Sequence, residues 1–515
     1  MNKSISRKRG DNNFRKQDIP ESSILKSLLY SIIRYALIIA ILSFVLFVVS
    51  TRVPIVRYFF EEDAPDIKIV DIPKGLGVNP GKLKLEVSDP HSGIELVRAR
   101  VEQSRINKVL IEESPPLNTK TFLKSIQIDA QALGLRKGMA RITVEAYDRS
   151  LKSNGSKSFI DLPVRFDAPK IEILSSQHNG EKSGMEFVVY RLKAGEVAET
   201  GIRIGPYSFK GFPASSFDPD IAGISDLYVA LYAIPNKVDT RKDVPTSFAL
   251  NEVGNISLQN FYYRIRERKK RSWEYRTDNL LASQESMQNV ISIKLSEIPP
   301  VSTRLWLTHI PKPVGKETSP RIGDDIRIIN NSGREQTFQN LLITMRTSKN
   351  QEIRTTAPGV LILSGWINQN GEWLENKTPG SGPLSGVVAI DHGMGLVSVF
   401  CGLDDINNLT GAKFSENAII GTSGNLTLIN EPGYYYGLFF QGEAIRPEEW
   451  WDQTWVREHI TRKVQDIKIR YNIGGASLAA NEGSLVPSAE EPPTREIIRS
   501  LDDLRNQEQS VDKVD

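Results

Sequence analysis

The most prominent pattern along the chain is a block of apolar residues near its start. Tyr35–Val49 holds fifteen uncharged, mostly apolar residues, and extension back to Leu28 gives a run of twenty-two that only Arg34 interrupts. About twenty helical residues cross the hydrocarbon core of a bilayer, and an arginine near one end can reach the interface. We therefore predict a transmembrane anchor over residues 28–50.

After this block, apolar and polar residues alternate in short runs, which is the period of half-buried strands. Asp63–Ile69 reads DAPDIKI, and Asp167–Ile173 repeats the pattern as DAPKIEI, 104 residues later. About 100 residues of short strands between turn clusters is typical of an immunoglobulin-like sandwich. We predict two such domains in tandem, over residues 64–166 and 167–267.

The remainder of the chain divides into four further segments. Residues 268–330 are interrupted by prolines and are predicted to be a connector with a helix around Asn279–Ile293. Residues 331–460 are again rich in predicted strands, and the alternation over Lys463–Tyr471 predicts one more strand. Residues 474–515 contain so few apolar side chains that we expect a disordered polar tail. The expected fold class is mainly β with one N-terminal transmembrane helix.

Charge orients the predicted anchor. The 515 residues carry a net charge of +3, but the first 34 alone carry eight basic and three acidic side chains. Because positive charge stays on the cytoplasmic side, residues 1–27 are expected to form a basic cytoplasmic head. The bulk of the chain is then periplasmic, on a single-pass protein of the bacterial inner membrane. No small-x-small cleavage site follows the apolar run, so a removed signal peptide is the weaker interpretation.

Cysteine and histidine limit the possible metal chemistry. One cysteine excludes a disulfide framework and any zinc site built from several thiolates. Five histidines permit one metal site only if they come together in the fold.

The strand-rich segment 331–460 carries a set of ordered motifs. Gly386–Phe400 reads GVVAIDHGMGLVSVF and resembles the central hairpin of lysostaphin/LytM-type zinc endopeptidases, which cleave peptidoglycan. Four further landmarks of that family occur in the family's order, at Ala357–Val360, Gly411–Phe414, Ile419–Asn425 and Gln441–Asp452. The resemblance covers about 120 residues and implies a LytM-type β domain.

The resemblance also locates where a zinc site would be. Family members hold zinc on three protein ligands, and the metal-bound water is the nucleophile. In the alignment Phe338, Leu342 and Tyr435 stand at the ligand positions, and Gly402 and Gly433 stand at the two assisting histidines. Phenylalanine, leucine and glycine side chains offer a cation no lone pair. A shift of one residue restores nothing, because no histidine lies between His392 and His459.

The resemblance therefore implies a degenerate LytM domain, a pseudoenzyme with no catalytic or metal residue and no cofactor, although zinc is usual in the family. Degenerate members of the EnvC/NlpD type act as scaffolds or activators of peptidoglycan hydrolases. The expected partners are peptidoglycan or a hydrolase within an envelope assembly, with no nucleic acid. The candidate binding groove is formed by Phe338, Leu342 and Tyr435.

Two other functions remain open on the sequence. One is an active peptidoglycan metalloendopeptidase with a non-standard site, for which Cys401 is a conceivable ligand, although a small buried hydrophobe is the more common role for such a residue. The other is a structural or adhesive ectodomain in which the LytM fold serves as a spacer. His392 is interpreted as structural.

Overall fold

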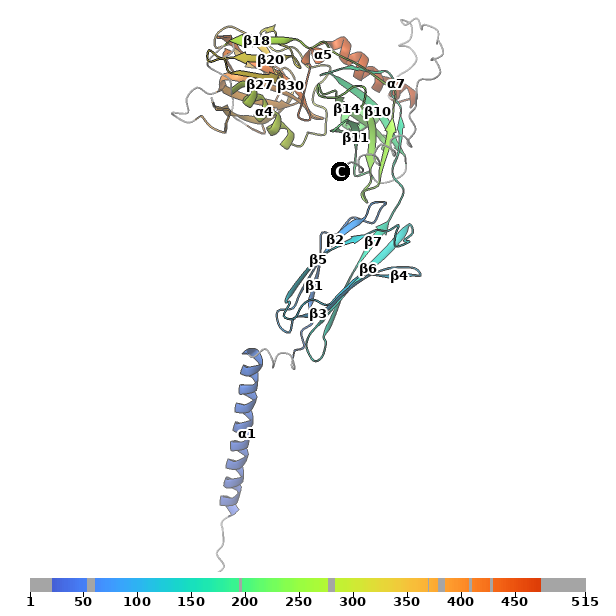
Figure 1. Cartoon of the computed structure of the whole chain (residues 1–515), viewed down its shortest axis with the longest axis vertical. Coiled ribbons are helices and arrows are strands. Elements are labelled where there is room, and N and C mark those ends of the chain that lie inside the picture. The colour runs from blue at the N-terminus through green and yellow to red at the C-terminus, as the bar shows by residue number, and fades with distance from the viewer. Residues whose placement is uncertain are drawn as a thin grey trace, which may run out of the picture. The chain divides into compact units, whose positions relative to one another are not determined.

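The computed structural model describes the chain in eight stretches, residues 21–52, 61–193, 197–276, 283–368, 370–377, 385–406, 410–426 and 429–473 (Figure 1). Most of the predicted basic head, residues 1–20, and the whole predicted tail, residues 474–515, lie outside the described residues.

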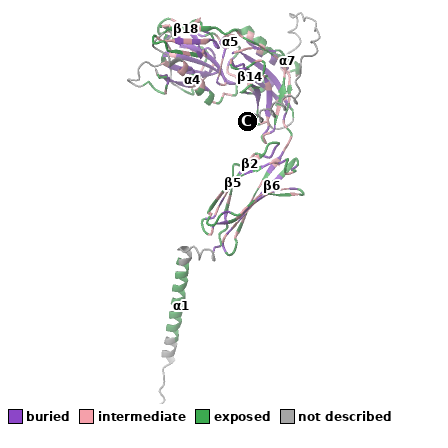
Figure 2. Ribbon diagram, viewed as in Figure 1, coloured by how far each residue is buried: buried purple, intermediate pink, exposed green. Residues whose placement is uncertain are grey.

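The N-terminal apolar block forms one long helix, α1 (Glu21–Arg52). Its stretch Leu28–Val48 has 21 residues with a mean hydropathy of 2.5, and none of it is buried against other protein (Figure 2). A helix of this length and composition can cross a bilayer. A signal sequence near an N-terminus meets the same criteria, so the helix is confirmed here and its orientation stays a prediction.

The segment after α1 folds into two antiparallel sheets around one core. Alternating side chains of the facing strands fill this core, among them Leu83, Leu85 and Val87 of one sheet and Val97, Ala99 and Val101 of the other. The sheet orders are β1-β2-β5 and β4-β3-β6-β7. The strands are β1 (Asp66–Val70), β2 (Gly81–Ser88), β3 (Ile94–Gln103), β4 (Ile106–Glu113), β5 (Thr121–Ile128), β6 (Gly138–Asp148) and β7 (Gly155–Val164).

A second pair of sheets follows, and each of these two sheets has four strands. Their orders are β13-β14-β10-β8 and β12-β11-β15-β16. Each DAP motif directly precedes the first strand of its segment, as the repeat predicts. The elements are β8 (Lys170–Ile173), β9 (His178–Glu181), β10 (Met185–Lys193), β11 (Glu199–Ile204), β12 (Tyr207–Lys210), β13 (Phe212–Pro213), α3 (Ala214–Phe217), η1 (Pro219–Ile221), β14 (Leu227–Ala233), β15 (Thr246–Leu250), β16 (Ile256–Asn260) and β17 (Tyr263–Arg266).

The third region is built on an eleven-stranded sheet whose main path runs β19-β22-β30-β29-β27-β26-β24-β25, beside a small sheet β18-β20-β21. Its elements are β18 (Ser272–Arg276), α4 (Ser283–Glu297), β19 (Lys316–Thr318), β20 (Asp325–Ile329), β21 (Glu335–Gln339), β22 (Ile343–Arg346), β23 (Glu352–Arg354), β24 (Gly359–Ile367), β25 (Trp373–Leu374), β26 (Ser385–Asp391), β27 (Leu396–Ile406), β28 (Lys413–Phe414), β29 (Ile419–Leu426), β30 (Glu431–Phe440) and β31 (Glu443–Ile445). The predicted hairpin is present as the antiparallel pair β26–β27.

Residues 268–330, expected as a connector, belong structurally to this third region. They contribute three strands to its sheets and the helix α4 to its core. The prolines that suggested a linker lie between these elements, where a missing amide hydrogen costs no ladder bond.

The strand predicted over Lys463–Tyr471 is wrong, because this segment is helical. The chain forms α5 (Pro447–Trp451), α6 (Gln453–Val456), the π-helical η2 (Arg457–Thr461) and α7 (Arg462–Arg470). The apolar residues Val456, Ile460, Val464 and Ile467 recur every three or four positions, which is the helical period that the local alternation concealed.

A buried ion cluster joins β10 to the C-terminal helices. The Glu186 carboxylate is 1% exposed and accepts hydrogen bonds from Lys463 Nζ at 2.7 Å and from His459 Nδ1. Lys463 Nζ also donates to the Phe187 carbonyl at 2.9 Å. Because each charge is paired, the cluster avoids the cost of an isolated buried ion.

We predict that Glu186→Gln destabilises the protein by about 3–5 kcal/mol, because it leaves Lys463 charged and buried without its counter-ion. Urea unfolding of the full chain in detergent measures the loss. Glu112→Gln is the matched control, since Glu112 pairs with Arg98 at the surface and its removal changes little. Equal effects of the two variants would contradict the prediction.

Candidate functional site

Strand β30 carries two of the five aligned site positions and divides its side chains between two cores. Tyr434 and Tyr436 point into one core with Phe400, whereas Tyr435 and Phe439 point into the other with Cys401. All of these side chains are at most 3% exposed. Since side chains alternate along a strand, the two cores lie on opposite faces of the sheet.

Helix α4 covers the face that carries Tyr435. Met287, Ile291 and Leu295 are spaced four residues apart, so they form one stripe of the helix, and all three pack in the core that contains Leu342, Tyr435 and Phe439. Figure 1 shows α4 alongside β27 and β30. The sequence predicted a helix here but not its docking, although the spacing of these three residues is a signal that could have indicated a buried stripe.

Hydrogen bonds fix the helix in place at two points along its length. The Gln288 side-chain oxygen accepts from the Leu341 amide at 2.6 Å, and Ser292 Oγ donates to the Gly442 carbonyl at 3.2 Å. The first of these bonds attaches α4 to the residue next to Leu342.

The structure brings most of the aligned ligand positions together. Leu342 and Tyr435 share one core, and a Cβ added at Gly402 would lie 3.3 Å from the Tyr435 ring. Gly433 lies two residues before Tyr435 on the same strand face, where an added Cβ would collide with the Met345 carbonyl. Phe338 is separate, in a small core with Ile326 and Ile328.

The candidate groove is therefore closed at the residues expected to line it. Phe338, Leu342 and Tyr435 are 7%, 1% and 3% exposed. A cavity of about 240 Å³ remains beside Tyr435, and two residues of β22 contribute to its lining. Its lining includes residues that sequence reasoning did not single out, namely Trp273, Glu274, Tyr275, Thr344 and Arg346.

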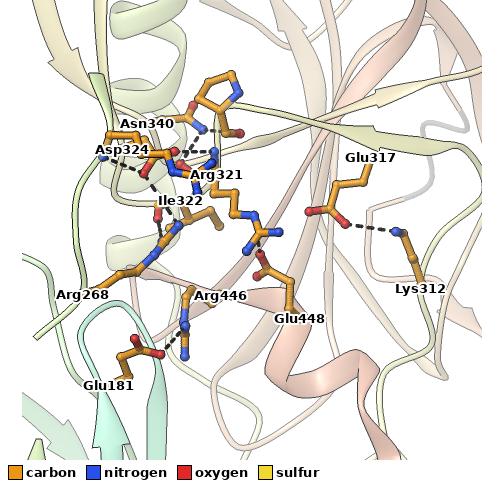
Figure 3. Close-up of polar contacts among 12 residues, drawn as sticks. Glu181, Arg268, Lys312, Glu317, Arg321, Ile322, Asp324, Asn340, Arg446 and Glu448 are labelled. Atoms are coloured by element: carbon orange, nitrogen blue, oxygen red, sulfur yellow. Dashed lines mark hydrogen bonds and ion pairs between the residues drawn. The ribbon is translucent and has the colours of Figure 1, made fainter. Parts of the chain in front are cut away.

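A buried aspartate organises the loop between Phe338 and Leu342. Asp324, 1% exposed, accepts hydrogen bonds from Trp273 Nε1 at 3.0 Å and from the Arg321 amide at 3.0 Å, and pairs with Arg268 at 3.6 Å. Asn340 Nδ2 donates to the Arg321 carbonyl at 3.1 Å, and the backbone amide of Asn340 donates to the Asp324 carbonyl (Figure 3). This network holds the loop that contains Asn340, between Phe338 and Leu342.

Both ring nitrogens of His392 take part in a chain of hydrogen bonds. Its Nδ1 donates to the Pro358 carbonyl at 2.8 Å, and its Nε2 accepts from Ser398 Oγ at 2.8 Å. The Tyr436 hydroxyl lies 3.1 Å from Ser398 Oγ and completes the chain. Burial lowers the pKa of His392 to about 4, so the ring is neutral near pH 7.

Cys401 is fully buried on the same face as Tyr435, its pairing partner on β30. Burial raises the pKa of its thiol far above the usual range. A thiol that stays protonated is a weak nucleophile. The aligned positions themselves present two apolar side chains, two glycines and one tyrosine.

No protein-family profile matches the chain. An uncharacterized protein of Neisseria meningitidis serogroup B is 34% identical to it over 64 residues, which are 12% of this chain and 11% of that protein. The chain thus spans about a tenth of the length of this curated relative.

Solved structures similar to the chain include peptidases. A putative peptidase M23 from Pseudomonas aeruginosa aligns with 52% of this chain and 93% of its own, at 14% identity and a TM-score of 0.33. A zinc-containing peptidase from Vibrio cholerae covers 74% and 84%, at 8% identity and a TM-score of 0.19. A chain of the SpoIIQ–SpoIIIAH pore-forming complex covers 29% and 92%, at 15% identity and a TM-score of 0.20. These scores are low, so the function proposed below rests on the residues of this chain.

We predict that Ile291→Ala lowers the free energy of unfolding by about 3 kcal/mol, because it leaves a cavity under α4. Ile293→Ala is the matched control on the same helix, since Ile293 is 58% exposed and the change in helix propensity is equal. All seven tryptophans lie between residues 273 and 455. Urea unfolding followed by tryptophan fluorescence therefore reports on this region, and equal losses from the two variants would mean that α4 is not docked.

The neutral His392 makes stability depend on pH. The folded pKa of about 4 lies below the ordinary 6.5, so the unfolded chain takes up the proton first. The stabilisation is complete above about pH 6.5 and falls by about 3 kcal/mol as the pH drops toward 4. The free energy of unfolding, measured by denaturation with tryptophan fluorescence between pH 7 and 4, should fall less steeply with decreasing pH in His392→Gln than in the wild type. His309→Gln should show the wild-type pH dependence. An unchanged pH dependence in His392→Gln would contradict the prediction.

Proposed function

We propose that this chain is a membrane-anchored, extracytoplasmic protein whose degenerate LytM-type domain acts as a non-catalytic scaffold or regulator of peptidoglycan hydrolysis. One observation carries the proposal. The sheet face with Leu342 and Tyr435, two of the three aligned ligand positions, is apolar and is covered by α4 of the same chain. A peptidase needs metal donors and an open fourth coordination position there, and this face offers neither.

The location follows from α1 and the basic residues before it. The apolar stretch Leu28–Val48 has the length of a membrane span, and the net +5 charge of residues 1–34 favours a cytoplasmic N-terminus. In this orientation the three β regions face the periplasm, where peptidoglycan lies. The two tandem sandwiches, which we interpret as immunoglobulin-like, then serve as spacers between the membrane and the LytM-type domain.

The cavity beside Tyr435 is the proposed contact with peptidoglycan. Aromatic side chains offer sugars and peptide stems a large apolar surface with a polar edge, and Trp273, Tyr275 and Tyr435 supply three rings. Arg346 also lines the cavity and pairs with Glu431 at 2.7 Å, with its side chain 42% exposed. A carboxylate of a peptide stem is a suitable second partner for this guanidinium.

Sedimentation of the full chain with isolated peptidoglycan sacculi tests the proposed contact. We expect binding by the wild type and a loss of about tenfold in affinity for Arg346→Gln, which corresponds to one charge-assisted hydrogen bond. Arg354→Gln is the matched control, because Arg354 pairs with Glu352 at similar exposure and lies outside the cavity lining.

Two results would contradict the proposal as a whole. One is stoichiometric zinc in the purified chain together with release of muropeptides from sacculi, which would establish a peptidase with a non-standard site. The other is the absence of sacculus binding together with no effect of the chain on sacculus digestion by an added peptidoglycan hydrolase, which would favour a structural ectodomain.

A further inference from the structure

Three acidic side chains meet in the interior of the first β region, far along the chain from the site described above. Glu61 lies in the segment before β1, Asp89 directly follows β2, and Asp148 ends β6. One carboxylate oxygen from each lies within 4.8 Å of the other two. The three residues are 7%, 2% and 0% exposed, so water does little to screen their charges from one another.

Basic residues close in sequence have other partners, since the Arg149 guanidinium donates to the carbonyls of Ile94 and Pro115, and Lys152 binds Glu62 at 2.7 Å. Three buried carboxylates without a counter-ion are costly, so the group needs a cation or protons.

One oxygen of the group has no hydrogen-bond partner. Glu61 Oε2 accepts from the Ser92 amide at 3.0 Å, whereas Glu61 Oε1 is buried and has no partner in the described part of the chain. Buried polar atoms of this kind are rare in native proteins and mark a place where a water or ion belongs. An ion is favoured over water, because this carboxylate also has an oxygen within 4.8 Å of two further carboxylates.

The surrounding turns hold the other two carboxylates in fixed orientations. Asp148 Oδ1 accepts from Ser150 Oγ and from the Asn154 amide, both at 2.8 Å, and Asp89 Oδ1 accepts from the His91 amide at 2.8 Å. Asn154 Nδ2 also donates to the Glu61 carbonyl at 3.0 Å. Metal-binding carboxylates are oriented by outer hydrogen bonds of this type.

We propose that Glu61, Asp89 and Asp148 form a calcium site. The donors are all oxygens and come from three separate segments, which suits a hard cation with a flexible shell of six to eight oxygen ligands, about 2.3–2.6 Å away. Mg²⁺ requires a tighter octahedron and keeps more of its water, and Zn²⁺ favours nitrogen and sulfur ligands. Backbone carbonyls and water complete the shell.

The site would fasten the segment that precedes β1 to the body of the first β region. Glu61 is the first described residue after α1, whereas Asp89 follows a strand of one sheet and Asp148 ends a strand of the other. Calcium binding would therefore fix the point at which the chain leaves the anchor and begins the sandwich. The inference is independent of the proposed role in peptidoglycan hydrolysis.

Calorimetric titration of the EGTA-treated full chain in detergent, with CaCl₂ and with MgCl₂, tests the proposal. We expect one Ca²⁺ per chain, weaker Mg²⁺ binding, and a loss of at least about tenfold in Ca²⁺ affinity for Glu61→Gln. Glu62→Gln is the matched control, because Glu62 is the adjacent acid and is exposed. Unchanged Ca²⁺ affinity in Glu61→Gln would overturn the assignment.

Hydrogen exchange of the wild type provides a test that needs no variant. We expect Ca²⁺ to slow exchange in peptides that cover residues 86–95 and 147–156, which contain the amides bonded to the carboxylates. Peptides of the third β region should not change. No Ca²⁺ binding by the wild type, or no slowing in these two peptides, would overturn the proposal.

Discussion

The interaction on which the third region depends is the burial of one face of β30 beneath α4. Met287, Ile291 and Leu295 remove from water the face that contains Leu342, Cys401, Tyr435 and Phe439. Each large apolar side chain buried in this way contributes about 1.5–3 kcal/mol. A metal site on this face would need polar donors, an opening to solvent and room for a substrate. Beneath α4, the apolar contact that stabilises the sheet thus leaves neither an opening nor room for such a site.

Three polar residues of the interior receive their hydrogen bonds from neighbouring elements. Asp324 holds the loop before β22, His392 connects β26 to β27 and to the loop before β24, and Glu186 connects β10 to the C-terminal helices. Such networks specify geometry more than they add stability. Glu61 differs from these residues, because one of its oxygens lacks a partner within the described residues. That difference is the reason for assigning it to a ligand.

The local elements could largely be predicted from the sequence, whereas their docking could not. The two strands after the DAP motifs and a helix near Asn279–Ile293 follow from period and turn residues, which are local properties. The β26–β27 hairpin was predicted from the family resemblance of Gly386–Phe400. The burial of α4 against Tyr435, and its hydrogen bond to Leu341, join segments about fifty or more residues apart. The alternation over Lys463–Tyr471 predicts a strand, whereas the structure has helix α7 (Arg462–Arg470) there. A window of about nine residues can fit both the strand period and the helix period. The proposed calcium ligands Glu61, Asp89 and Asp148 are spread over a sequence separation of 87 residues. No short sequence motif therefore indicates that they meet.

The docked state of α4 is tested most directly by amide hydrogen exchange of residues 283–297 in the full chain. The account predicts that the amides of the last two turns of α4 exchange as slowly as those of β30, because the helix opens only when the sheet face does. Added zinc should change neither rate. Rapid exchange throughout α4 while β30 stays protected would show that the helix leaves the face open, and would contradict the claim that the chain closes its own site.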